Sequence, residues 1–307
     1  MSDEQSAPVC YRHRNRETYL SCSRCGKPIC ADCRIDAPVG FQCPDCVAEG
    51  RRTTRQARTS FGGVAGAGAA GTVTKVLIGL NLAVFILAGL STGNLAELMT
   101  TGSTPLHLIG AEIGFLPGYD AIRVELFGTQ VIAPTVAAGG YYRMVTAMFL
   151  HYGFIHLGFN MLVLWLFGRA LEQDLGPARF LSVYMLSGLA GSVAVYFFAA
   201  DTATAGASGA VYGLFGLLVM VNRKLKRDNR SIYILIGLNL ALTLFIGFSF
   251  WGHVGGLIGG LICGVIVTFT PRERRRLHWA GFAVFLALLA AATFLQTSLL
   301  DNQYNIV

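Results

Sequence analysis

The sequence predicts an all-α polytopic membrane protein: a six-helix core and one further C-terminal transmembrane helix, preceded by a small two-zinc module. Three observations lead to this prediction. Of the 307 residues, 53% are hydrophobic and only 13% are charged, whereas soluble domains are about a quarter charged. Seven apolar runs approach the roughly 20 residues with which a helix crosses a bilayer. Seven of the eight cysteines fall within residues 10–46.

The N-terminal cysteines form pairs with the spacing of metal ligands. Two residues separate the members of each pair, which are Cys10 and His13, Cys22 and Cys25, Cys30 and Cys33, and Cys43 and Cys46. Two tetrahedral zinc sites need eight nitrogen or sulfur donors, so these residues complete two structural sites. The alternative is a disulfide scaffold, which needs an oxidising compartment; the basic block that follows favours the reducing cytosol.

The alternation of the pairs resembles the cross-brace of B-box and RING-like modules. The resemblance implies two ligand sets, Cys10, His13, Cys30 and Cys33 for one ion and Cys22, Cys25, Cys43 and Cys46 for the other. Sequential pairing stays open at this point. Because the module has too small an apolar core to fold alone, bound metal supplies its folding free energy. We expect residues 1–50 to be a cytosolic zinc-binding module that binds a protein partner.

A linker is expected at residues 51–73. Four arginines between Arg51 and Arg58 precede a segment from Gly62 to Gly71 that is almost wholly Gly, Ala and Val, which is typical of a flexible tether. The polar N-terminus lacks the apolar region of a cleaved signal peptide. The first span is therefore expected to be the targeting signal.

We expect seven spans, near residues 74–92, 145–168, 178–199, 207–222, 231–249, 252–270 and 278–299. Basic residues cluster before residue 74 and at 222–230 and 271–276, whereas the loops near 201–205 and 250 have no Lys or Arg. Because cytoplasmic loops are rich in Lys and Arg, alternation predicts a cell-membrane protein with a cytosolic N-terminus and an external C-terminus. The net charge of +7 lies in short blocks beside apolar runs, so no nucleic-acid partner is expected.

Three further segments complete the expected organisation. Residues 168–177 are expected to form the turn after the second span. Residues 93–143 are too long for a tight turn and too apolar for a disordered loop, so we expect an external, partly membrane-embedded loop. The core then covers residues 74–271, and residues 272–307 add one transmembrane helix and a short external tail.

Ser208 stands among small residues at the start of the fourth predicted span. A single serine in such a span usually serves helix packing, so its neighbours in space decide its role. Small residues recur at helical spacing in both spans: Gly209, Gly213 and Gly216 in the fourth, and Gly252, Gly256, Gly260 and Gly264 in the sixth. Such faces let helices approach closely. Contact between the fourth and sixth spans would bring His253 to Ser208.

Depth in the membrane supports a shared site. Fifteen residues separate Ser208 from Arg223, which is about 22 Å of helix, and His156 lies about 20 Å before Arg169. The two side chains are therefore expected at similar levels. The same count makes His253 somewhat shallower. Asn160 follows His156 by four residues and shares its helical face.

These residue types suit nucleophilic catalysis. A serine hydroxyl needs a base, for which His253 is the candidate, and donors for the oxyanion that forms on attack. The first backbone N–H groups of the fourth span, together with His156 and Asn160, can supply these donors. No carboxylate lies in the spans at this depth to orient His253, so a Ser-His dyad is expected. Asn81, Asn239 and Cys263 are expected to be packing residues.

Over about residues 75–270 the chain resembles the rhomboid family of intramembrane serine proteases. The motifs that carry the resemblance are a long first external loop ending in Tyr142 and Arg143, residues 151–160, Leu171 and Glu172 followed by Gly176, the Gly206-x-Ser208-Gly209 motif with Tyr212, and Gly252-His253 with Gly256. The family commonly has Trp where this chain has Tyr142.

The resemblance implies a role for each residue of the site. Ser208 would be the nucleophile and His253 its base, and His156, Asn160 and the Ser208 amide would be the oxyanion donors. The supporting residues would be Gly206, Gly209, Tyr212, Gly256, Arg143 and Glu172. The resemblance also implies substrates with a small residue at the cut.

We therefore expect an intramembrane serine endopeptidase that cuts transmembrane segments of membrane proteins in the bilayer near the outer face, with no cofactor for catalysis. The alternative is a non-catalytic rhomboid-like protein that holds membrane clients while the zinc module recruits a cytosolic partner. The presence of both Ser208 and His253 argues against this alternative. A transporter would show inverted repeats, and the sequence has none.

Overall fold

The computed structural model describes residues 7–53, 58–63, 71–93, 103–246, 249–271, 274 and 276–304. The chain divides into two compact units, Met1–Ala57 and Arg58–Val307. About half of the predicted linker, at residues 54–57 and 64–70, lies outside the described residues, as do Arg272, Glu273 and Arg275 of the last basic block.

The N-terminal unit is built around its cysteines. Its elements are η1 (Ala31–Cys33), β1 (Ile35–Asp36), β2 (Phe41–Gln42) and α1 (Pro44–Thr53), with β1 and β2 antiparallel. The buried cluster contains Ile29 and otherwise only cysteines, with Tyr11, Leu20 and Phe41 packed against it. So few apolar side chains cannot stabilise a fold of this length, which agrees with the expected need for metal.

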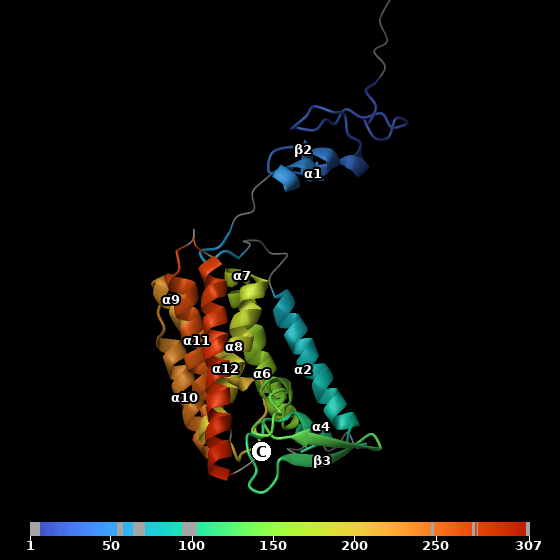
Figure 1. Ribbon diagram of the computed structural model, residues 1–307. Helices are drawn as coiled ribbons and strands as arrows, with labels where there is room; N and C mark the ends of the chain where they lie inside the picture. Colours follow the sequence, from blue (N-terminus) through green and yellow to red (C-terminus); the bar gives the residue numbers. More distant parts are fainter. Residues whose placement is uncertain are drawn as a thin grey trace, which may run out of the picture. The chain divides into compact units, whose positions relative to one another are not determined.

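The larger unit is a bundle of apolar helices (Figure 1). Its long helices are α2 (Thr72–Leu90), α6 (Gly153–Val163) continued by η3 (Leu164–Gly168) and α7 (Arg169–Leu175), α8 (Pro177–Phe198), α9 (Ser208–Lys224), α10 (Arg230–Ile246), α11 (Phe250–Phe269) and α12 (Arg276–Tyr304). Each of the seven predicted spans falls on one of these helices. Five of the described helices are long and apolar enough to cross a membrane; α9 and α10, of 17 residues each, are shorter.

The predicted end of the second span is wrong. The helix begins at Gly153 rather than at residue 145 and continues through the π-helical turn η3 to Leu175, and the chain reverses at Gly176, whose φ is 86°. Glu172, expected in a turn, lies on the buried side of this helix. Its carboxylate accepts three hydrogen bonds from the first turn of α2, at 2.8–2.9 Å. Because the buried carboxylate is satisfied in this way, the helix can continue past Glu172.

The centre of the bundle is formed by α8, α9 and α11. Glycines let the backbones of α9 and α11 meet: a Cβ at Gly256 would collide with the backbone of Gly209, and a Cβ at Gly260 with that of Gly213. The predicted pairing of the fourth and sixth spans is therefore confirmed. Cys263 is fully buried in this core, as expected.

The connection between α2 and α6 is an ordered domain rather than a plain loop, although residues 94–102 lie outside the described part. It contains α4 (Pro105–Gly110), the antiparallel strands β3 (Ala121–Leu126) and β4 (Thr129–Pro134), and the short helices α5 (Arg143–Thr146) and η2 (Ala147–Phe149). Figure 1 shows α4 and β3 at one end of the bundle. Part of the region predicted as the second span, residues 145–152, belongs to this connection.

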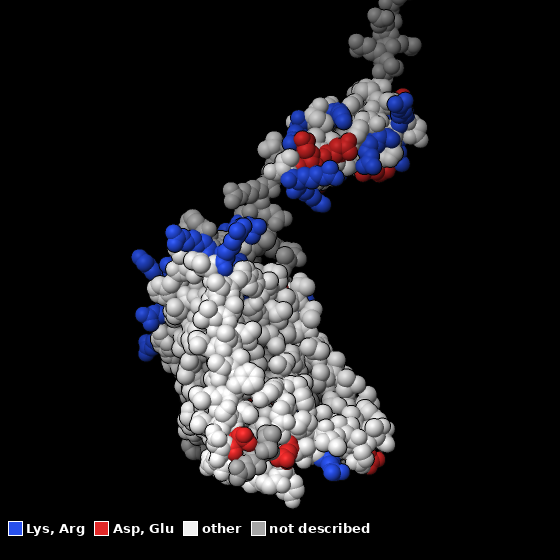
Figure 2. Space-filling view, viewed as in Figure 1, with Lys and Arg blue, Asp and Glu red and all other residues white. Residues whose placement is uncertain are grey.

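The charges of the bundle are concentrated near its ends. In Figure 2 most Lys and Arg atoms of this unit lie at the end where α9 finishes and α12 starts, and the flank between the ends is almost without charge. The loop between α9 and α10 contributes Lys226 and Arg227 to the basic end. An uncharged flank of this kind is what a bilayer requires.

Candidate functional site

Ser208 is the first residue of α9, and the backbone before it is shaped by a glycine. Gly206 has a φ of 138°, and its N–H donates to the Ala147 carbonyl at 2.8 Å. A Cβ at Gly206 would lie 2.8 Å from Cε1 of His156 and 3.5 Å from Oγ of Ser208. Only glycine fits this position, and the side chains of His156 and Ser208 border it from two elements.

His253 reaches the same face of α9 from the first turn of α11. Ser249 caps α11 by accepting a hydrogen bond from the Gly252 N–H at 3.2 Å. The His253 ring is 5% exposed and stacks on Tyr212, with centroids 4.2 Å apart and planes 9° apart. Because Tyr212 follows Ser208 by four residues, the stack lies one turn along the face that carries the serine. Within the described residues, no hydrogen bond joins Ser208 to His253.

Asn160 is less directly tied to the serine than His156 is. It is buried on α6, and its Nδ2 donates to the His156 carbonyl one turn earlier, at 2.9 Å. The first N–H groups of α9 have no carbonyl partner within the helix, and no side chain caps them. The site thus combines two histidines, a serine and the first backbone N–H groups of α9, and these groups come from three helices.

One further histidine, to which the sequence analysis gave no role, supports the approach to Ser208. Nε2 of His151 accepts a hydrogen bond from the Ala207 N–H at 3.3 Å, and its ring meets that of His156 edge-on at 5.1 Å. His107 in α4 hydrogen-bonds in turn to the His151 carbonyl at 3.1 Å. The signal in the sequence was a second histidine five residues before His156.

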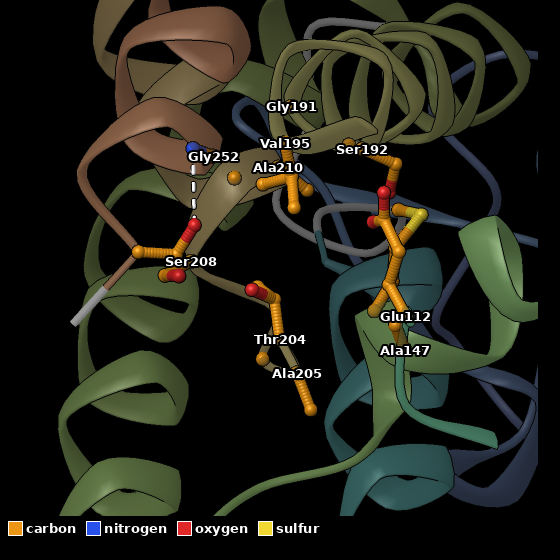
Figure 3. A pocket seen from close by; sticks show the side chains of 15 residues that line it. Glu112, Ala147, Gly191, Ser192, Val195, Thr204, Ala205, Ser208, Ala210 and Gly252 are labelled. Atoms are coloured by element: carbon orange, nitrogen blue, oxygen red, sulfur yellow. Dashed lines mark hydrogen bonds between the residues drawn. The ribbon is translucent and has the colours of Figure 1, made fainter. Parts of the chain in front are cut away.

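A small cavity opens beside Ser208, between α8, the start of α11 and the α2–α6 connection. Its volume is about 30 Å³, room for about one water molecule. Figure 3 shows Glu112, Ser192, Ser208 and Gly252 around it. Sequence reasoning missed Glu112 because it searched the spans for a carboxylate, whereas Glu112 comes from the connection.

Arg143 holds the connection together. Its side chain is 0% exposed, and the guanidinium donates to four carbonyl groups at 2.6–3.1 Å, those of Leu108, Ala111, Ala133 and Pro134. Glu172 has the corresponding function at the other end of the bundle, where it caps α2. Both residues support the fold around the site, and neither lines the cavity.

The N-terminal unit brings its eight candidate ligands into two clusters. They are Cys10, His13, Cys30 and Cys33 in one and Cys22, Cys25, Cys43 and Cys46 in the other, and within each cluster the ligand atoms lie within 4.8 Å of one another. This is the cross-brace arrangement, so sequential pairing is excluded. All eight cysteines of the chain are free thiols, and the sulfur and imidazole donors fit tetrahedral zinc.

The helical unit is similar in sequence to known proteins. A family model described as the Rhomboid domain matches residues 138–269. The chain is 40% identical over 135 residues to the rhomboid protease GluP of Bacillus subtilis, covering 41% of this chain and 26% of that protein. It is 38% identical over 147 residues to the putative rhomboid protease YdcA of the same organism, covering 46% of this chain and 73% of the relative.

A plant relative, RHOMBOID-like protein 6 of Arabidopsis thaliana, is 35% identical over 163 residues, covering 51% of this chain and 53% of that protein. The chain thus spans from about a quarter to about half of the length of the first relatives it matches, while it covers most of YdcA. The matched segment contains Ser208, His253, His156 and Asn160. With these matches and its apolar spanning helices, the chain is a multi-pass membrane protein that belongs to the rhomboid family.

Proposed function

We propose that this protein is an intramembrane serine endopeptidase that cleaves transmembrane segments by acyl transfer through Ser208. The observation that carries the proposal is the meeting of three helices at one serine. The Gly206 turn brings His156 beside Ser208, and the glycine contact between α9 and α11 brings His253 onto the same face. The relatives that are named rhomboid proteases agree with this chemistry.

The proposed roles follow from the positions of the groups. His253 takes the proton of the Ser208 hydroxyl as the hydroxyl attacks the scissile carbonyl, and returns it to the leaving amine. The Ser208 N–H, His156 and Asn160 stabilise the oxyanion. Stacking on Tyr212 fixes the imidazole plane, which replaces the orienting carboxylate of a triad. Within the described residues, Nδ1 of His253 has no hydrogen-bond partner, in keeping with a dyad.

We further infer that cleavage takes place near the outer face. The 17 residues of α9 extend about 25 Å, less than the roughly 30 Å of a hydrocarbon core. With the basic end at the cytosolic surface, Ser208 lies a few ångströms inside the opposite face. The concentration of Lys and Arg at one end (Figure 2) supports this orientation, with the N-terminus in the cytosol.

The N-terminal unit is proposed to hold two structural zinc ions. The metal would supply the cross-links that the small core lacks, so that the folded unit offers a surface to a cytosolic protein partner. It takes no part in the proposed peptidase chemistry, and its ligands lie outside the segment matched by the Rhomboid model.

The proposal is tested by reconstituting the purified chain in liposomes with a panel of single-span model substrates. Their transmembrane segments carry helix-weakening Gly and Pro pairs at different depths. We expect products cut within the outer part of the apolar segment, mapped by mass spectrometry, and none with Ser208→Ala or His253→Ala. Cleavage that persists in Ser208→Ala would overturn the proposed nucleophile. Tight substrate binding without cleavage would favour the client-holding alternative.

A further inference from the structure

Glu112 is held beside the candidate nucleophile by the backbone. Its N–H donates to the Thr204 carbonyl, and the Thr204 N–H donates to the Glu112 carbonyl, both at 2.8 Å. This two-bond bridge joins the α2–α6 connection to the loop that leads into Ser208. The side chain is 1% exposed and lines the same small cavity as the serine (Figure 3).

Burial and a neighbouring hydroxyl act in opposite directions on the pKa of Glu112. Ser192 has one hydroxyl proton and donates it to the Met144 carbonyl at 2.9 Å. The Ser192 hydroxyl also lies within hydrogen-bonding reach of the Glu112 carboxyl group. Burial raises the pKa of Glu112 well above its usual value, and the bond to Ser192 offsets only part of this rise. Burial therefore favours the protonated form of Glu112.

One oxygen of this acid has no partner. Within the described residues, no group donates a hydrogen bond to Oε1 of Glu112, although a buried carboxyl oxygen without a donor is costly. The cavity of about 30 Å³ has room for a group of about the size of one water molecule. A ligand group that fits must be small, and it binds most tightly if it donates a hydrogen bond to this oxygen.

The lining of the cavity indicates which side of the bond to be cut would enter it. The leaving amine must face His253, because the base returns the proton to it. Neither His253 nor its stacking partner Tyr212 lines the cavity, whereas Ser208, Gly209 and Gly252 do. The side chain that enters it therefore belongs to the residue that becomes acylated onto Ser208.

We propose that Glu112 makes this pocket selective for serine, so that substrates of this protein are cleaved after a serine in preference to an apolar residue of the same size. The hydroxyl group of the substrate serine enters the cavity and donates a hydrogen bond to Oε1 of Glu112. This inference rests on the proposed peptidase function and adds the identity of the residue before the cut.

The test uses short peptide aldehydes, which add reversibly to an activated serine and present their last side chain to the acyl-side pocket. Two peptides differ only in that residue, serinal or 2-aminobutanal, which match in size but differ by a hydroxyl in place of a methyl group. Each competes with a fluorophosphonate probe for the full-length protein in detergent. We expect serinal to compete about tenfold better, the size of one hydrogen bond to an otherwise unpartnered buried group.

Variants of Glu112 test whether this residue causes the preference for serinal. The ratio between the two aldehydes should fall to about one in Glu112→Met and be largely kept in Glu112→Gln, which retains an acceptor oxygen. Glu125→Gln, an exposed position on β3, should leave the ratio as in the wild type. The ratio compares two probes on one sample, so a change in the amount of folded protein does not affect it.

The outcomes separate the inference from the proposed function. If wild type labels with the fluorophosphonate but the two aldehydes compete equally, the serine pocket is wrong and the peptidase stands. A preference for serinal that survives in Glu112→Met would also reject the role of Glu112. If wild type does not label at all, the proposed function fails, and the serine selectivity with it.

Discussion

At the scale of single residues, the site depends on backbone positions that only glycine can occupy. Gly206 combines a φ of 138° with contact to both His156 and Ser208. A side chain there would strain the turn and displace the His156 ring, although Ser208 would keep its hydroxyl group. The turn before Ser208 therefore shapes the candidate site without supplying a reactive side chain.

Gly206→Ala is expected to lower the rate of serine labelling by about 100-fold, since strained positive-φ backbone costs on the order of 1–3 kcal/mol and the Cβ would collide with His156. The rate is measured with a fluorophosphonate in detergent. The control is Gly118→Ala, which also has a positive φ, of 79°, but whose Cβ would meet nothing within 4 Å. Equal rates in both variants would refute the role given to the His156 contact.

Arg143 is expected to be essential for stability. Arg143→Met leaves four carbonyls without their donor, two of them in buried hydrogen bonds, and a buried group without a partner costs about 1–3 kcal/mol. We expect a fall of at least about 10 °C in the unfolding temperature of the detergent-solubilised protein. Arg123→Met removes an exposed arginine of the same connection and should have little effect. A similar small shift in both variants would contradict the structural role of Arg143.

At the scale of elements, the close contact between α9 and α11 brings His253 to the serine. The glycine spacing in the two sequences predicted this pairing, because small residues at one helical face have a direct structural meaning. The end of the second span was not predictable in the same way. The sequence predicts a turn at residues 168–177, and the buried Glu172 is explained only by the distant first turn of α2, which binds it.

In the α2–α6 connection, too, the sequence did not predict the contacts that form the candidate site. Ser208, His253 and His156 were found because polar groups in apolar spans are conspicuous. Glu112 and the four carbonyls bound by Arg143 belong to a segment without helical periodicity. Their neighbours in space come from residues up to about a hundred positions away, such as Thr204, and no local pattern indicates such contacts.

Gly260→Ala is expected to destabilise the contact between α9 and α11, since its Cβ would collide with the backbone of Gly213. Overpacking of this kind costs about 1–3 kcal/mol, and a forced helix shift would also lower labelling of Ser208. Gly237→Ala in α10 meets nothing within 4 Å and gains helix propensity. The unfolding temperature and the labelling of Ser208 should therefore fall in Gly260→Ala and stay the same or rise in Gly237→Ala. Equal values for the two variants would argue against the contact.

At the scale of the whole molecule, a compact cysteine-rich unit is joined to a rhomboid helical unit. The clustering of four donors at each of two places was anticipated from the regular spacing of the pairs, and the structure decides between the two ways of pairing them. The arrangement implies separate tasks, because the candidate metal ligands and the candidate catalytic residues belong to different units.

The full-length protein is expected to contain two zinc ions per chain, measured by atomic emission after removal of loosely bound metal. Cys33→Ser should lower the content by about one ion, because each cluster supplies four ligands to one metal. Cys263→Ser, which changes a buried cysteine of the helical core, should leave it at two. A zinc content near zero in the wild type would show that the clusters do not hold this metal.

The central claim, that Ser208 is an activated nucleophile, is tested most directly by fluorophosphonate labelling of the purified protein followed by peptide mapping. We expect one labelled residue, Ser208, and labelling that is lost in Ser208→Ala and reduced by at least about 100-fold in His253→Ala, the range of general base catalysis. Ser187→Ala, a buried serine on α8, should label like the wild type. Folded wild-type protein that fails to label, or that labels equally without His253, would contradict the claim.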